Sequence, residues 1–140
     1  MNISGPLRTA IIADTVIAPL LATYRSQPAV FTRRPVPPGA TFPYVLTAHN
    51  VAVTNRDTLN SFQPIIVRDI ISYGEQKSHF RDVETIAYRL YELFHRQEQA
   101  LEIPGFHVVK LTMAGPIPAP VADDQNTGQA VTLTAHLQQQ

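Results

Sequence analysis

The stretch QPIIVRDIISYGEQKSHFRDVETIAYRLYELF, residues 63–94, decides the fold class. Its first part, Gln63–Gly74, carries apolar residues on both alternating faces, which predicts a strand near the centre of a sheet. Its second part follows Ser78, a good N-cap residue, and has apolar residues at the spacing of one helix face. These residues are Phe80, Val83, Ala87, Leu90 and Phe94. We therefore expect a central strand that leads into a long amphipathic helix.

Upstream of this stretch, residues 7–23 have a helical pattern that Asp14 and Pro19 interrupt. Asp14 is a suitable N-cap, so two helical pieces or one kinked helix are expected there. Residues 43–54 predict one strand, and Ala29–Thr32 a short one. The N-terminal part thus adds helix and strand to the same fold.

Downstream, His107–Met113 alternates as a strand with Val109, Leu111 and Met113 on one face. The segment 114–129 is rich in proline and polar residues, which predicts a long connection. Residues 130–137 alternate as a half-exposed antiparallel strand. The order predicts an α+β fold: a mostly antiparallel sheet with an N-terminal helix and one long amphipathic helix packed on one face. We expect one domain, residues 1–140.

Composition limits the classes of function. The 140 residues contain 11 basic and 11 acidic side chains, so no net charge attracts nucleic acid or an anionic membrane. Cysteine is absent, which excludes disulfides and thiolate metal sites. The sequence shows neither a signal peptide nor an apolar run long enough to span a bilayer. We expect a soluble protein that is made in the cytoplasm.

Catalytic motifs are lacking, and the five histidines have no spacing that suits a shared metal ion. We therefore expect no enzyme activity, no metal and no cofactor. Asp69 lies in an apolar strand, and a carboxylate with a raised pKa is one interpretation. A structural role is favoured, either through pairing with Arg68 or Arg56 or through exposure at the end of the strand. The pair Asp123 and Asp124 is better explained as a solvated turn than as a metal site.

The segment PVPPGATFPYVL, Pro35–Leu46, is stiff and poor in backbone donors. Its prolines fix φ and reduce the entropy cost of ordering a loop. We predict that Arg33–Thr41 is a stiff loop that contacts a neighbouring subunit or partner, and that a core strand begins near Pro43. A rigid surface connector is the equally weighted alternative. The pair Arg33 and Arg34 suits an interface rim or solvent.

The order of four segments carries a resemblance to a known family. These segments are IIADTVIAPLL, PPGATFPYVL, NRDTLNSFQPIIVRDIISYGEQKSHFRDVETIAYRLYELF and ADDQNTGQAVTLTAHL. Over Leu7–Leu137 the chain resembles the tail terminator (tail completion) proteins of long-tailed bacteriophages and of phage-like particles such as gene transfer agents. Matching features are the strand after a proline loop at Phe42–Leu46, the turn at Arg56 and Asp57, and the strand and helix of Ile65–Phe94.

The resemblance implies a structural virion protein at the tail–head junction. Such a protein forms a homo-hexameric ring that caps the tail tube, ends tail polymerisation and joins the tail to the head. Its partners would be copies of itself, the major tail tube protein and the head completion (stopper) protein, with DNA only as cargo in the lumen and no membrane. Expected residues at a subunit or tube interface are Arg33, Arg34, Pro37, Pro38, Arg56, Asp57, Asp69, Asp123 and Asp124.

Two other classes of function stay open on the sequence. One is a small cytosolic α+β adaptor that binds a peptide at an exposed sheet edge, suggested by Val131–Leu137. The other is an enzyme that uses Asp69 and a histidine, which has little support. A ring subunit, an adaptor and an enzyme make different demands on the surface, so the fold can separate them.

Overall fold

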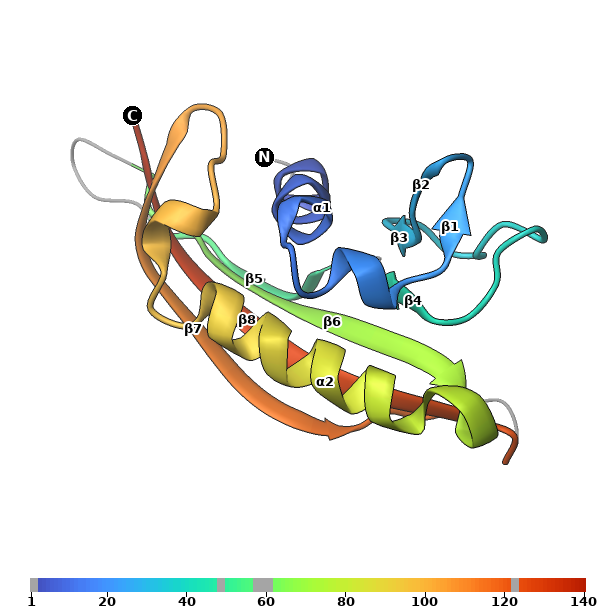
Figure 1. Cartoon of the computed structure of the whole chain (residues 1–140). Helices are drawn as coiled ribbons and strands as arrows, with labels where there is room; N and C mark the ends of the chain where they lie inside the picture. The colour runs from blue at the N-terminus through green and yellow to red at the C-terminus, as the bar shows by residue number, and fades with distance from the viewer. Residues whose placement is uncertain (1–2, 48–49, 57–61, 122–123) are drawn as a thin grey trace.

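The computed structural model describes residues 3–47, 50–56, 62–121 and 124–140. It has the expected α+β architecture, in which helices α1 (Ser4–Ala13) and α2 (Gln76–Phe94) pack on one face of a mostly antiparallel sheet (Figure 1). Short 3₁₀ helices η1 (Ala18–Leu20) and η2 (Glu98–Ala100) follow α1 and α2. The fold class predicted from the sequence is confirmed.

The main sheet has the strand order β3-β4-β6-β8-β7, and β5 also pairs with β6. Its strands are β3 (Val30–Phe31), β4 (Tyr44–Leu46), β5 (Asn50–Thr54), β6 (Ile65–Glu75), β7 (Phe106–Pro118) and β8 (Asn126–Gln139). Only β3 and β4 run parallel; the other pairs are antiparallel. A separate hairpin joins β1 (Thr23–Tyr24) to β2 (Gln27–Pro28).

The centre of the sheet is β6, as its two apolar faces predicted. Along one edge it pairs first with β5 and then with β4, so the single strand expected over residues 43–54 is in fact two strands. Along the other edge it pairs with β8 without interruption from Ile65 to Glu75. This long ladder sets the positions of the loops at the two ends of the molecule.

The alternation predicted for the last strand is confirmed, but its position is not at an edge. Val131, Leu133, Ala135 and Leu137 are buried, and β8 lies between β6 and β7. Its ladder groups are therefore used on both sides, which removes the observation that motivated a peptide-binding adaptor.

Helix α2 supplies much of the core, with small departures from the predicted face. It begins at Gln76, so Ser78 lies inside the helix and is not its N-cap. The buried residues are Val83, Ile86, Ala87, Leu90 and Phe94. Phe80 is 42% exposed and does not belong to the main cluster, so its assignment to the buried helix face was wrong.

The turn from β6 into α2 depends on Gly74. A Cβ at this position would lie 2.6 Å from the Cβ of His79 and 2.7 Å from Cγ2 of Val83, both on the helix. Only glycine permits this approach without a shift of the first helical turn. The strand and helix that decide the fold are thus joined at one position with no room for a side chain.

Strand β7 is longer than expected and irregular. A register shift between Val108 and Lys110 places Val108 in the core and leaves Val109 53% exposed, so the prediction that Val109 shares a face with Leu111 and Met113 was wrong. A second irregularity lies between Ala114 and Ile117, after which β7 continues to Pro118. Because β8 begins at Asn126, the predicted connection over 114–129 is mostly strand.

The N-terminal region forms the expected two helical pieces. The backbone N–H of Ile17 donates a 3.0 Å hydrogen bond to Oδ2 of Asp14, as a capping residue requires, and η1 follows. Leu7, Ile11 and Ile17 are fully buried in the cluster that also contains Ile66 and Leu90. Both helices therefore cover the same face of the sheet.

Candidate functional site

The side of the sheet that faces away from the helices is the first candidate surface. On β6 the residues of this face are half-buried, whereas their neighbours on the helix side are buried. The face includes Ile65, Val67, Asp69 and Ile71, with Thr132, Thr134 and His136 of β8 beside them. It combines apolar and hydroxyl side chains in neighbouring rows, a composition that suits contact with another protein.

Asp69, a predicted interface residue, lies in the middle of this open face. Its Oδ1 accepts a 2.8 Å hydrogen bond from Oγ1 of Thr132, directly across the ladder. Asp69 thus has a structural partner, but this partner is a hydroxyl group; the predicted pairing with Arg68 or Arg56 and the predicted position at the end of the strand are both wrong. Sequence reasoning could not identify this partner because it depends on the register between β6 and β8.

Arg68 points to the opposite side of the same strand and is only 5% exposed. Its Nε donates a 2.9 Å hydrogen bond to Oδ1 of Asn50, and its terminal nitrogen donates to Oγ of Ser4 and to the carbonyl of Thr47. Burial lowers the pKa of this guanidinium. Within the described ranges no carboxylate pairs with it, so neutral oxygen atoms hold this buried cation between α1 and the sheet.

The second candidate surface is the predicted stiff loop, Arg33–Thr41, here called the arm. Val36 and Ala40 pack against the buried cluster of Ala29, Phe31 and Leu46, and Tyr24 and Tyr44 pack against the same cluster, so that with Phe31 they form an aromatic cluster beside the arm. Ring centroids are 5.3 Å apart for Tyr24 and Phe31 and 5.5 Å apart for Phe31 and Tyr44, both edge to face. The arm is therefore fixed to its own subunit, and the strand that follows begins at Tyr44, next to the predicted Pro43.

The arginines of the arm are both exposed. A terminal nitrogen of Arg34 lies 3.4 Å from the Tyr73 hydroxyl, a long hydrogen bond that ties the arm to the end of β6. Beside it, burial raises the pKa of the Tyr44 hydroxyl. Pro37 is half-buried and borders, with Arg8 and Arg33, a hollow of about 340 Å³. Pro38 is exposed, so the arm presents cations and a proline to the surroundings.

The remaining predicted interface residues are spread along the sheet. Arg56 is exposed beyond the end of β5, close to where β6 begins. Asp124 is exposed at the other end, where it borders a hollow of about 430 Å³ together with Phe42 and Glu75. The length of β6 separates these two ends by about 35 Å. Asp57 and Asp123 lie outside the described residues. The predicted set therefore does not form one continuous surface.

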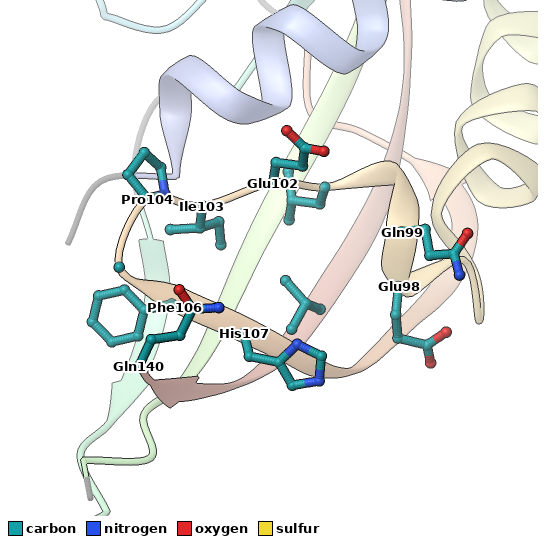
Figure 2. A pocket seen from close by; sticks show the side chains of 11 residues that line it. Glu98, Gln99, Glu102, Ile103, Pro104, Phe106, His107 and Gln140 are labelled. Atoms are coloured by element: carbon teal, nitrogen blue, oxygen red, sulfur yellow. The ribbon is translucent and has the colours of Figure 1, made fainter.

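The third surface was not predicted and lies at the far end of the molecule. A hollow of about 530 Å³, here called the end pocket, lies between η2, the loop after it and the start of β7. Figure 2 shows Glu98 and His107 at one rim of this hollow and Glu102 at the opposite rim. Ile103, Phe106 and Val108 supply apolar lining. The one signal in the sequence is local charge, since residues 97–109 contain two glutamates and neither lysine nor arginine.

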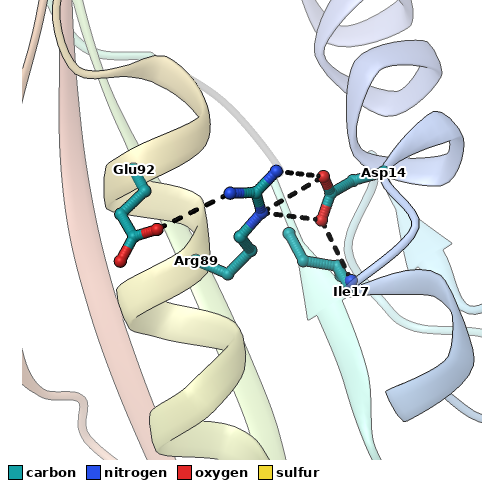
Figure 3. A network of polar contacts seen from close by, with 4 residues as sticks. All are labelled: Asp14, Ile17, Arg89 and Glu92. Atoms are coloured by element: carbon teal, nitrogen blue, oxygen red, sulfur yellow. Dashed lines mark hydrogen bonds and ion pairs between the residues drawn. The ribbon is translucent and has the colours of Figure 1, made fainter.

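Both ion pairs recorded among the described residues involve Arg89 (Figure 3). Its terminal nitrogen lies 2.8 Å from Oδ1 of Asp14, and Nε donates to both carboxylate oxygens of that residue. The hydrogen bonds from Arg89 hold the pKa of Asp14 below its usual value of 3.8. Glu92 adds a looser 3.6 Å contact. This network joins α1 to α2 and is structural, and the sequence did not indicate it.

Two further kinds of site are absent from the residues that the structure describes. The described part of the chain has no group of three or more histidine, aspartate or glutamate side chains placed to hold a metal ion. Among its described helices, none has the length and apolar character needed to cross a membrane.

Comparison with known proteins gives a match at the level of the fold. No protein-family profile and no curated protein sequence matches the chain. A chain of a solved structure described as the virion of a native gene transfer agent (GTA) particle is similar, with a TM-score of 0.79 and 17% sequence identity. The similarity covers 96% of this chain and 93% of that chain. The two chains therefore share their fold almost from end to end.

Proposed function

We propose that this protein is a structural component of a phage-like particle: a ring subunit that caps the tail tube, ends its polymerisation and connects the tail to the head. The observation that carries the proposal is the fold similarity to a chain of a gene transfer agent virion. Because nearly the whole of both chains superposes, the similarity is not one common motif embedded in a larger and different protein. Fold alone does not fix function, so the surface must supply further support.

The surface supports an assembly role. A ring subunit needs two different patches, one for each neighbour, together with a surface for the tube or the head. The protein offers the open face of the sheet, the arm and the end pocket, which lie in different places on the fold. The resemblance in segment order to tail terminator proteins selects the tail–head junction among the positions in a particle.

The proposal is tested by deleting the gene in a strain that produces the particles. We expect tails of irregular and excessive length that do not join to heads, because nothing caps the growing tube. A plasmid copy of the gene should restore tails of uniform length. Tails of normal length that join heads normally in the deletion strain would refute the proposed function. The measurement is the distribution of tail lengths by negative-stain electron microscopy.

A further inference from the structure

We propose that the arm of one copy, Arg33–Thr41, docks into the end pocket of a second copy, so that subunits associate head to tail. This inference rests on the proposed function and names the contact by which the ring would form. The occupant of the pocket is another molecule of the same chain. Three observations support it: the opposite charges of the arm and the pocket, the size and apolar lining of the pocket, and the location of the two at opposite ends of the fold.

The charge of the arm is one-sided. Residues 15–55 contain three arginines and no carboxylate, and two of these arginines, Arg33 and Arg34, are exposed on the arm. Since the net charge of the chain is zero, the rest of the sequence carries the compensating negative charge. An isolated subunit therefore has a basic surface whose counterpart lies elsewhere on the chain.

The end pocket has the complementary character. Its lining includes Glu98 and Glu102 and contains no lysine or arginine. In Figure 2 the side chains of these two glutamates lie on either side of the hollow and point outward, so they give its mouth a negative charge that the arginines of the arm can approach. Phe106 and the apolar lining offer a surface for proline, whose rigid ring stacks well on aromatic side chains. A hollow of about 530 Å³ has room for several side chains of such a segment.

The two surfaces cannot meet within one molecule. Strand β8 gives a common scale for the two positions. Arg34 of the arm lies beside Tyr73, which pairs with Gly128 of β8. Phe106 of the pocket pairs with Gln139 of the same strand. Eleven strand residues separate these two positions on β8, a distance of about 35 Å. In Figure 1 the arm next to β4 and the loop after α2 lie at opposite ends of the molecule. A contact between them is therefore between copies.

Such a contact is heterologous, because each copy uses its arm toward one neighbour and its pocket toward the other. Repetition of a heterologous contact generates a closed ring or an open filament, never an isolated two-fold dimer. The aromatic cluster holds the arm in place before association, which reduces the entropy lost when it docks. The same fold thus contains a fixed projection at one end and a receptor at the other.

The absence of cysteine makes a direct test available. One variant carries Pro38→Cys on the arm, and a second carries Gln99→Cys at the pocket; both positions are exposed. Under mild oxidation an equimolar mixture should give the mixed disulfide dimer at about tenfold excess over the two homodimers, because a disulfide needs Cα atoms within about 7 Å. The control replaces the second variant with Thr85→Cys, an exposed position on α2, and should give no excess.

Charge reversal sharpens the same experiment. In the cysteine background, Arg33→Glu with Arg34→Glu should reduce the mixed disulfide about tenfold, since like charges would then face each other. Reversal of the pocket as well, by Glu98→Arg with Glu102→Arg in the partner, should restore it. Restoration by the paired reversal would show a direct contact, since a folding defect in one variant would not be repaired by a change in the other. Circular dichroism of each variant checks that it is folded.

The two failures are distinguishable. A mixed disulfide no more abundant than the homodimers, or equal to the Thr85→Cys control, would overturn the arm-to-pocket contact. That result would leave the tail-length experiment on the gene deletion unaffected. Conversely, abundant mixed disulfide with normal tails in the deletion strain would retain the contact and refute the proposed function.

Discussion

The two faces of β6 are built from neighbouring residues, yet they serve different purposes. On the helix side Ile66 and Ile70 are fully buried, and even the cation Arg68 is nearly inaccessible. On the open side Ile65, with its apolar neighbours, is only half-buried. The first face is fully used by the fold of one subunit. The second retains apolar area that a partner could still bury, as the proposed assembly role requires.

The largest contrast should come from two adjacent isoleucines. Ile66→Ala should lower the free energy of unfolding by about 3 kcal/mol, because it leaves a cavity between β6 and the helices. Ile65→Ala, on the open face, should cost about 1 kcal/mol or less, since solvent already reaches it. Urea denaturation followed by circular dichroism measures both. Equal losses would mean that the two faces are equally buried in the folded monomer and would break the comparison.

A slightly smaller contrast is expected between the neighbouring charged residues. Arg68→Ala should destabilise by about 2–3 kcal/mol, because it removes buried hydrogen bonds and leaves Asn50 and the carbonyl of Thr47 without a donor. Asp69→Asn keeps an oxygen to accept from Thr132 and should change stability by less than about 1 kcal/mol. The same denaturation experiment tests both variants. A larger loss for Asp69→Asn would assign it a structural importance that its position does not suggest.

The pair between Asp14 and Arg89 should give a pH-dependent effect on the helix side. Since hydrogen bonds from Arg89 lower the folded-state pKa of Asp14, its contribution is present above 3.8 and is lost as the pH falls through the folded value. Asp14→Asn should therefore lower the free energy of unfolding by about 1–2 kcal/mol at pH 7. The effect is smaller than for a fully buried ion pair, because Arg89 is about one-third exposed and solvent screens the pair.

This cost should shrink toward zero when unfolding is measured below pH 3.8, where the wild-type carboxyl group is increasingly protonated in both states. Glu92→Gln, at the exposed end of the network, serves as the control and should change little at any pH. A stability difference for Asp14→Asn that stayed constant with pH would contradict the role given to the ion pair.

A modest effect on folding, but a larger one on assembly, should come from the arm. Pro37→Gly with Pro38→Gly should lower the free energy of unfolding by only about 1–2 kcal/mol, through greater freedom of the unfolded chain. The disulfide experiment needs a cysteine at position 38 and therefore cannot be made in this variant. The yield of assembled particles is measured instead. We expect a larger relative loss of finished particles than of folded protein. Pro120→Gly, in the connection between β7 and β8, is the matched control.

The elements that depend on local pattern could be predicted from the sequence. The alternation around Ile66 and Ile70 indicated a central strand, and the helical spacing after it indicated α2. Departures arose where tertiary structure overrides pattern. The register shift beside Val109 reversed its face, and β7 continued through a proline-rich segment that resembled a loop.

The candidate surfaces were harder to predict, for a physical reason. The stiffness of the arm follows from its prolines, but its attachment to Tyr24 and Tyr44 depends on the tertiary fold. The end pocket combines η2 with the start of β7. The sequence alone does not show that Glu98 and Glu102 line one hollow. The bond between Asp69 and Thr132 likewise depends on strand register. The Asp69–Thr132 bond and the attachment of the arm join residues distant in sequence, whereas residues 98–108 line most of the end pocket and only Gln140 comes from elsewhere.

The central claim is that this protein occupies the tail–head junction of a phage-like particle. Electron cryo-microscopy of purified particles, with a small tag on the chain, tests it directly by showing where the tag lies. We expect extra density in a ring at the head-proximal end of the tail tube, and none in particles from the untagged strain. Tag density on the capsid shell or at the distal tip of the tail, or intact particles that lack the protein altogether, would contradict it.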